Sequence, residues 1–153
     1  MKFRLSLIST AVLIALLASF VPLGATVQSV AAATLCDAAQ FKADVTVPDG
    51  SVYAPGATFT KTWRLKNIGT CTWTTGYTLV YVSGEKMGTT LSVPLPSSVA
   101  PGAEVEVSVP MTAPATAAKY RGNWQLKNAS GVLFGIGANA NGVFWVEIVV
   151  SGG

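Results

Sequence analysis

The chain has 153 residues, of which 50% are hydrophobic and 11% are charged, and its formal net charge is +3. So few charges among so many apolar residues exclude an intrinsically disordered chain, and the length suffices for one domain with a hydrophobic core. The sequence contains no histidine. This excludes Ser-His-Asp and Cys-His catalysis and any histidine-ligated metal site.

Residues 1–33 have the pattern of a secretory signal peptide. Two cations among the first four residues precede an apolar run from Leu5 to Val21, and the helix breakers Pro22 and Gly24 follow it. Small residues then lead up to Ala33, after which we expect a signal peptidase to cut. A single transmembrane anchor is the alternative, because about 17 apolar residues lie at the lower limit of a membrane-spanning helix.

Cleavage would leave a nearly neutral protein that is secreted or associated with the cell envelope. Eight Lys and Arg residues then stand against seven Asp and Glu residues. A balance of +1 gives no reason to expect a nucleic-acid partner. We also expect no stable membrane span after cleavage.

The two cysteines, Cys36 and Cys71, are predicted to form a disulfide, because an even count in an exported chain favours pairing. The bond would close a loop of about 36 residues and stabilise the fold by about 3.5–4 kcal/mol. A redox or metal pair would need a C-x-x-C spacing or a third ligand. Cys36 would thus tie an N-terminal segment, residues 34–40, to a domain at residues 41–150, with a tail at 151–153.

The domain is predicted to be all-β, an immunoglobulin-like antiparallel β-sandwich of about 7–9 strands. It shows no helical period over twelve residues, and short alternating runs are separated by Pro, Gly and Asn. We expect strands at residues 44–47, 59–65, 77–82, 104–109, 120–126 and 144–150.

Two of these strands carry the same motif and should be equivalent core strands. Trp-x-Leu-Lys-Asn begins at Trp63 and again at Trp124, so we place one strand in each sheet with both indoles facing inward. Phe59 and Leu65 share the inward face of the first strand. Tyr120 has the placement of a tyrosine corner, a tyrosine whose hydroxyl bonds the backbone upstream in immunoglobulin folds.

Four tryptophans with their flanking motifs carry a resemblance to a known family. They occur in the blocks Thr-Trp-Arg-Leu-Lys-Asn, Cys-Thr-Trp, Tyr-Arg-Gly-Asn-Trp and Phe-Trp-Val, at Trp63, Trp73, Trp124 and Trp145. The chain resembles, over residues 41–150, the four-tryptophan (FW) domain, the immunoglobulin-like module of the neighbour-of-BRCA-one type autophagy receptors. The resemblance implies that fold and a surface for protein recognition. We expect an exported, bacterial-type member to which the autophagy role does not extend.

No catalytic site is expected. Glycoside hydrolysis needs two facing carboxylates, whereas Glu104 and Glu106 share the solvated face of one strand. We likewise expect no cofactor and no bound metal.

The remaining candidates for ligand contact are aromatic residues and one loop. We predict a binding surface made of Trp73, Trp145 and Phe134 together with Asn139 and Asn141 of a Gly- and Asn-rich loop. Alternatively, the N-terminal segment covers both tryptophans. The sequence therefore predicts a monomeric, non-catalytic exported module that binds a protein, either a peptide segment or a cell-surface protein, or that has a structural role at the cell envelope. Carbohydrate binding through exposed aromatic rings is the second hypothesis.

Overall fold

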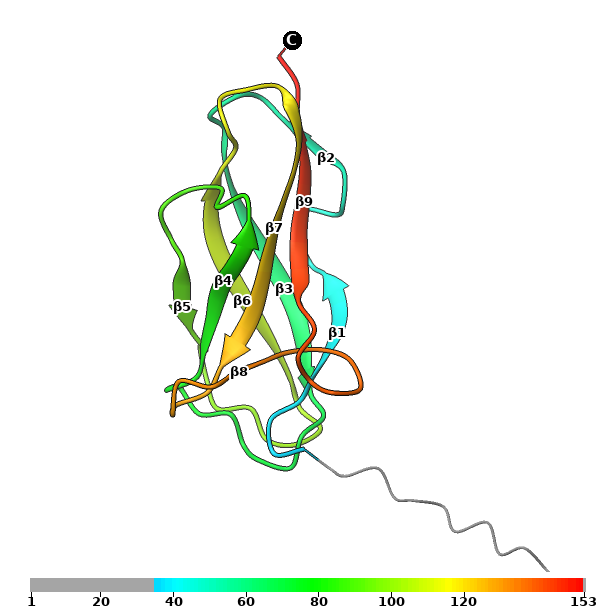
Figure 1. Cartoon of the computed structure of the whole chain (residues 1–153), viewed down its shortest axis with the longest axis vertical. Helices are drawn as coiled ribbons and strands as arrows, with labels where there is room; N and C mark the ends of the chain where they lie inside the picture. Colours follow the sequence, from blue (N-terminus) through cyan, green and yellow to red (C-terminus); the bar gives the residue numbers. More distant parts are fainter. Residues whose placement is uncertain (1–34, 153) are drawn as a thin grey trace, which may run out of the picture. The chain divides into compact units, whose positions relative to one another are not determined.

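The computed structural model describes residues 35–152, so the predicted signal peptide lies outside the described residues. Within them the chain is all-β, as predicted, and folds into a two-layer sandwich of nine strands (Figure 1). No helix of this part of the chain is long and apolar enough to cross a membrane. The strands are β1 (Ala39–Asp44), β2 (Ser51–Tyr53), β3 (Thr58–Asn67), β4 (Thr78–Gly84), β5 (Ser92–Pro94), β6 (Glu104–Thr112), β7 (Ala118–Lys127), β8 (Leu133–Phe134) and β9 (Phe144–Val150).

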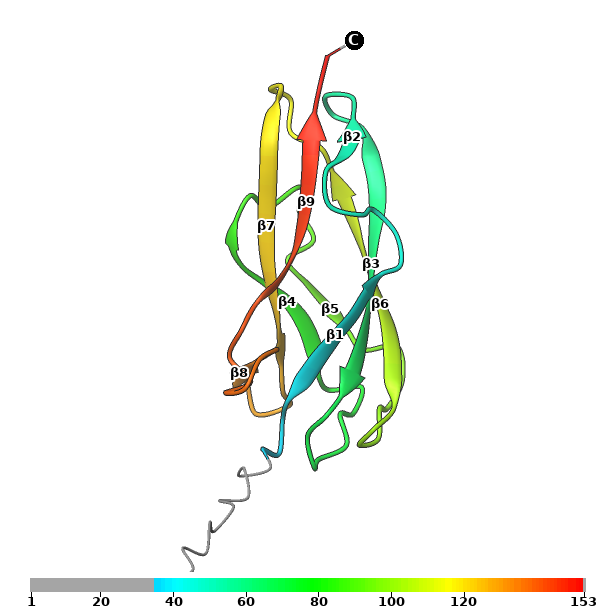
Figure 2. The same ribbon diagram turned by 90° about the vertical axis from the view of Figure 1, so that its right-hand side faces the viewer.

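The strands form two sheets that pack face to face. One sheet has the order β1-β3-β6, and the other has the order β2-β9-β7-β4-β5 with β8 beside β7. Figure 2 shows β7 and β9 in one layer and β3 and β6 in the other. All pairs are antiparallel except β2 with β9.

The prediction of a strand at residues 44–47 is wrong, because β1 ends at Asp44. The N–H groups of Val45 and Thr46 both point to the carbonyl of Thr62, at 2.9 and 3.3 Å. Val47 then takes a positive φ of 55°, which is strained for a β-branched residue. These contacts bend the chain out of the first sheet, and it joins the other sheet as β2.

Tryptophans from the two sheets meet in the core. Trp63 of β3 and Trp124 of β7 are fully buried, and their ring centroids lie 5.7 Å apart. Leu65 is also fully buried, while Phe59 and Tyr120 are partly buried against the same core. The Tyr120 hydroxyl donates to the carbonyl of Thr116 at 2.9 Å, which is the hydrogen bond of a tyrosine corner.

The predicted disulfide between Cys36 and Cys71 is confirmed, with the two Cα atoms 4.8 Å apart. It fastens the start of the domain to the loop after β3. The N–H of Cys71 also donates to the carbonyl of Cys36 at 3.0 Å. Gly69 allows this approach, because a Cβ atom there would lie only 2.2 Å from the same carbonyl oxygen.

We predict that reducing this disulfide lowers the free energy of unfolding by about 4 kcal/mol, because the open chain gains the entropy of a loop of about 36 residues. Urea denaturation with and without reductant measures the loss. A Cys36→Ser/Cys71→Ser variant should show the same loss and no response to reductant. Thiol labelling of both cysteines in the folded, unreduced protein would contradict the prediction.

Candidate functional site

An apolar groove, which we call the side groove, runs between β1 and the beginning of β9. Its more enclosed part, about 70 Å³, is lined by Phe41, Asp44, Ile136, Phe144 and Trp145. Its wider part, about 420 Å³, is lined by Ala39, Gln40, Phe41, Ile68, Ile136, Gly137 and Ala138. Phe41 and Ile136 line both parts, so the two form one continuous surface.

The side groove lies where both sheets have an open edge. β1 is an edge strand that pairs only with β3. β9 pairs with β2 from Ile148 onward, so its first residues have a strand neighbour, β7, on one side only. Because no described strand bridges these two edges, aromatic side chains near them remain accessible, and Phe41 is 38% exposed.

The loop between β8 and β9 forms one wall of the side groove. Ile136 and Gly142 exchange two backbone hydrogen bonds, of 3.0 and 2.8 Å, and the N–H of Ala39 donates to the carbonyl of Gly135 at 3.0 Å. A Cβ atom at Gly135 would lie 2.0 Å from the carbonyl oxygen of Gly142, so this closure requires glycine. The loop is therefore fixed both to itself and to β1.

Trp145 is held in place on several sides. Its indole Nε1 donates to Asp49 at 2.9 Å, and the Arg121 guanidinium lies 4.6 Å from the ring centroid. Its backbone carbonyl accepts a hydrogen bond from the indole of Trp63 at 2.9 Å. A side chain fixed in this way loses little conformational entropy when a partner packs against it.

The charge of Asp44, the only charged residue among those that line the side groove, is neutralised from inside the domain. Lys61, a fully buried residue of β3, donates from Nζ to Asp44 at 2.5 Å and to the carbonyl of Val47 at 2.7 Å. A buried cation needs such partners. The pairing leaves an apolar groove without a net charge.

The ionisable groups with shifted pKa values pair with neighbours in the fold. Hydrogen bonds from Lys119 and Arg121 hold the pKa of Glu147 below its ordinary value of 4.5. Burial raises the pKa of Tyr77, and the hydrogen bond to Asp37 raises it further by a smaller amount. Among residues 35–152, no three His, Cys, Asp or Glu side chains lie close enough together to hold a metal ion.

The structure divides the predicted binding residues between the core and the surface. Trp73 and Phe134 are buried, with ring centroids 5.5 Å apart, so they cannot form the exposed patch expected of them. Trp145 is half-buried and lines the side groove, and Asn139 and Asn141 are exposed in the adjoining loop.

Sequence reasoning missed Phe41, Ile68 and Ile136. Phe41 follows Ala39 by two residues in β1, so the two side chains point to the same face of the strand, and Ala39 is buried. This spacing could have identified Phe41. Ile136 lies in a Gly- and Asn-rich stretch and has no local signal of this kind.

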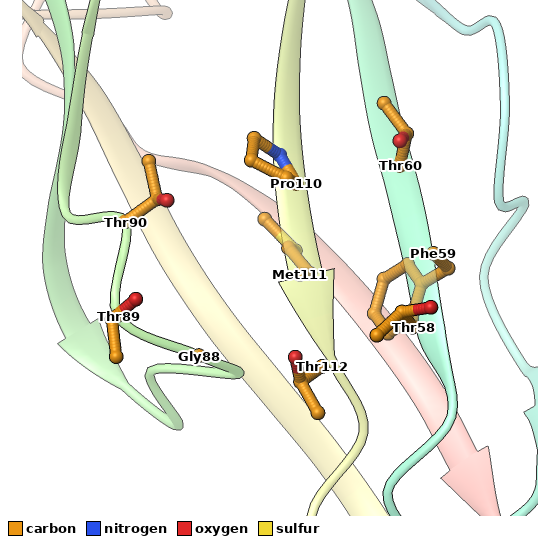
Figure 3. Close-up of a pocket in the computed structure, with 9 residues that line it drawn as sticks. All are labelled: Thr58, Phe59, Thr60, Gly88, Thr89, Thr90, Pro110, Met111 and Thr112. Carbon is orange, nitrogen blue, oxygen red and sulfur yellow. The ribbon is translucent and has the colours of Figure 1, made fainter.

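A second hollow, of about 350 Å³, lies at the edge of β6 and is rich in threonine (Figure 3). We call it the threonine hollow. The loop after β4 closes it, since the N–H of Thr112 donates to the carbonyl of Met87 at 2.9 Å. Its lining offers five hydroxyl groups and no charged side chain, and consists of Thr58, Phe59, Thr60, Gly88, Thr89, Thr90, Pro110, Met111 and Thr112.

The lowered pKa of Glu147 predicts a loss of stability in acid. Its folded-state pKa is below 4.5, so the stabilisation is complete above pH 4.5 and is lost as the pH falls through the folded-state value. The difference in unfolding free energy between the wild type and Glu147→Gln should therefore shrink from about pH 6 to about pH 3. Urea denaturation at each pH measures it.

Glu85 provides a control for this measurement. It is exposed and takes part in no ion pair within the part of the chain that the structure describes. Glu85→Gln should follow the wild type at every pH. A Glu147→Gln difference that does not change with pH would contradict the assignment.

Comparisons with known proteins agree with this architecture. The family model for the Ig-like domain from next to BRCA1 gene matches residues 46–150. Protein ILRUN of Danio rerio is 36% identical over 113 residues, which cover 74% of this chain and 38% of that protein. Protein JOKA2 of Solanum tuberosum is 40% identical over 99 residues, and the NBR1 homolog of Arabidopsis thaliana is 36% identical over 99 residues.

The latter two alignments cover 63% of this chain and only 12% and 14% of the relatives' lengths. The chain thus spans well under half of the length of each of these proteins. Because the family model covers more than half of the chain, this protein belongs to the family of Ig-like domains from next to BRCA1 gene.

Proposed function

We propose that this protein is a non-catalytic, exported module that recognises another protein, and that the side groove is its recognition surface. The observation that carries this proposal is the immobilised Trp145 in the wall of an apolar, uncharged groove. Aromatic residues in such positions dominate the binding energy of protein interfaces. Membership of the Ig-like family is consistent with a binding role.

The chemistry of the side groove defines the partner. Because Asp44 is already paired with Lys61, the groove offers apolar contact and no free charge. A matching protein would present apolar side chains from a peptide segment or from a surface loop. The open edge of β1 beside the groove adds backbone groups that an extended segment could pair with.

Export is supported by two independent features. The N-terminal pattern is that of a signal peptide, and Cys36 and Cys71 form a disulfide, which persists in oxidising compartments. We place the protein outside the cytoplasm, as a secreted or cell-envelope module of bacterial type that acts as a monomer. Most of the length of each relative has no counterpart in this chain. The roles of the relatives are therefore not extended to it.

Carbohydrate binding remains the alternative, and the threonine hollow is the feature that favours it. Hydroxyl groups line this hollow together with the aromatic side chain of Phe59. However, Phe59 already stacks on Tyr53, with centroids 4.4 Å apart, and Trp63, Trp73 and Trp124 are fully buried. Few aromatic faces therefore remain for stacking on a sugar.

Phe41→Asp should weaken partner binding at least about tenfold, because it places an unpaired charge in an apolar interface. Leu91→Asp is the matched control, since Leu91 is 40% exposed, Phe41 is 38% exposed, and Leu91 does not line the side groove. The wild type and both variants are used to capture proteins from extracytoplasmic material. A protein that the wild type and Leu91→Asp capture, but Phe41→Asp does not, is purified and its dissociation constants are measured.

A glycan array, run in parallel, tests the alternative. Glycan binding that Thr60→Val abolishes and Phe41→Asp leaves unchanged would contradict the protein-recognition proposal. Equal binding of one purified protein partner by Phe41→Asp and the wild type would exclude the side groove as its site.

A further inference from the structure

The edge of β1 that borders the side groove carries backbone groups without a partner in the sheet. The carbonyl of Ala38 points toward β3, because it accepts a hydrogen bond from the N–H of Ile68. The next N–H, that of Ala39, points the other way and donates to Gly135. Since the backbone groups of alternate residues in a strand point to opposite edges, the N–H and carbonyl of Phe41 also point toward the groove.

The pairing within the small sheet supports this orientation. The register places Phe41 opposite Leu65 of β3. The N–H of Asn67 donates to the carbonyl of Ala103, just before β6, so the backbone of Asn67 faces β6, and by alternation that of Leu65 faces β6 as well. The backbone groups of Phe41 are therefore left without a partner in β3.

The edge of β9 on the other side of the groove is open in the same way. The carbonyl of Glu147 accepts a hydrogen bond from the N–H of Gly50, and that of Trp145 accepts one from the indole of Trp63, so both residues direct their backbone groups away from β7. From Ile148 onward, β2 occupies this edge as a parallel strand. The fold thus adds a strand to β9 beyond the groove and leaves the edge at Trp145 free.

The unpaired groups favour one form of ligand. A helix makes its backbone hydrogen bonds internally, so a helix in the groove would bury the N–H and carbonyl of Phe41 without partners, which is costly. An extended segment presents its own N–H and carbonyl groups and can pair with them. Its side chains alternate, and the enclosed part of the groove, about 70 Å³, has room for one aliphatic side chain.

The charges around the groove favour an uncharged segment. Ion pairs join Lys61 to Asp44, Arg121 to Glu147 and Lys42 to Glu104. Lys66 also has Glu104 as its register partner, and Asp49 accepts a hydrogen bond from the Trp145 indole. The charged groups near the groove thus lie beside partners within the fold, and a charged ligand side chain would lose its hydration without gaining a counter-ion.

We propose that the side groove recognises an extended, uncharged segment of a partner protein, which pairs with Phe41 as a short added strand and inserts one aliphatic side chain between Phe41 and Trp145. This inference rests on the proposed function, because it specifies the form of the ligand for the same groove. The contact at Gly135 and the irregularity in β1 between Phe41 and Ala43 limit the free edge, so the added strand is short.

A displayed library of random linear peptides, selected on the immobilised full chain, tests whether an extended segment suffices. We expect peptides that the wild type and Leu91→Asp bind and that Phe41→Asp does not, with aliphatic residues at alternate positions. If no peptide with this dependence on Phe41 is selected, the inference is overturned. Capture of a protein that still depends on Phe41 would then mean that the groove recognises a folded surface, and the proposed function would stand.

Hydrogen exchange at the Phe41 amide, measured by NMR on the full chain, shows whether a selected peptide pairs as a strand. A saturating peptide should slow this exchange at least about tenfold, because a bonded amide exchanges only when its hydrogen bond opens. The N–H of Ser108 is the matched control and should not change. It lies on the open edge of β6, from which Thr112 donates to Met87. Unchanged exchange at Phe41 with the peptide bound would overturn the inference and leave the groove as a binding surface.

Phe41→Ala and Phe41→Pro separate the role of the ring from that of the backbone. Both remove the ring, but only proline removes the N–H, and an edge strand accepts proline where the N–H lies outside the ladder. A selected peptide should bind Phe41→Pro at least about tenfold more weakly than Phe41→Ala. The urea midpoint establishes that each variant is folded. Equal affinities of the two folded variants would contradict pairing at Phe41.

Discussion

The indole of Trp63 connects the two layers of the sandwich, and the geometry of the side groove depends on it. Its ring lies 5.7 Å from Trp124 and 5.4 Å from Phe144, both in the opposite sheet. Its Nε1 donates to the backbone carbonyl of Trp145. One fully buried residue of β3 therefore fixes the spacing of the sheets and the position of the β9 backbone beside the groove.

The second constraint is the crossing of the chain from one sheet to the other. Lys61 is buried on the same strand as Trp63, and its Nζ binds both Asp44 at the end of β1 and the carbonyl of Val47. The cation also lies 5.5 Å from the Trp63 ring centroid. Because the chain leaves the first sheet at this point, the edges of β1 and β9 stay apart and the side groove remains open.

Much of the fold could be predicted from the sequence because its signals are local. The alternation of β3 and β7, the cysteine pair and the position of Tyr120 each depend on a few neighbouring residues. The crossing at residues 45–48 could not be predicted, because its hydrogen bonds go to β3. The candidate site was only partly predictable: Phe41 and Ile136 are 95 positions apart and meet only in the folded chain, and Trp73 is buried by distant residues such as Phe134.

Hydrogen exchange at the indole N–H groups tests most directly whether Trp63 holds the sheets together. Trp63 Nε1–H is bonded inside the core, whereas Trp145 Nε1–H is bonded to Asp49 near the surface. Measured by NMR, the Trp63 indole should exchange only through global unfolding, with a free energy equal to that from urea denaturation, and Trp145 should exchange faster through local motion. Exchange of Trp63 as fast as that of Trp145 would contradict the role assigned to it.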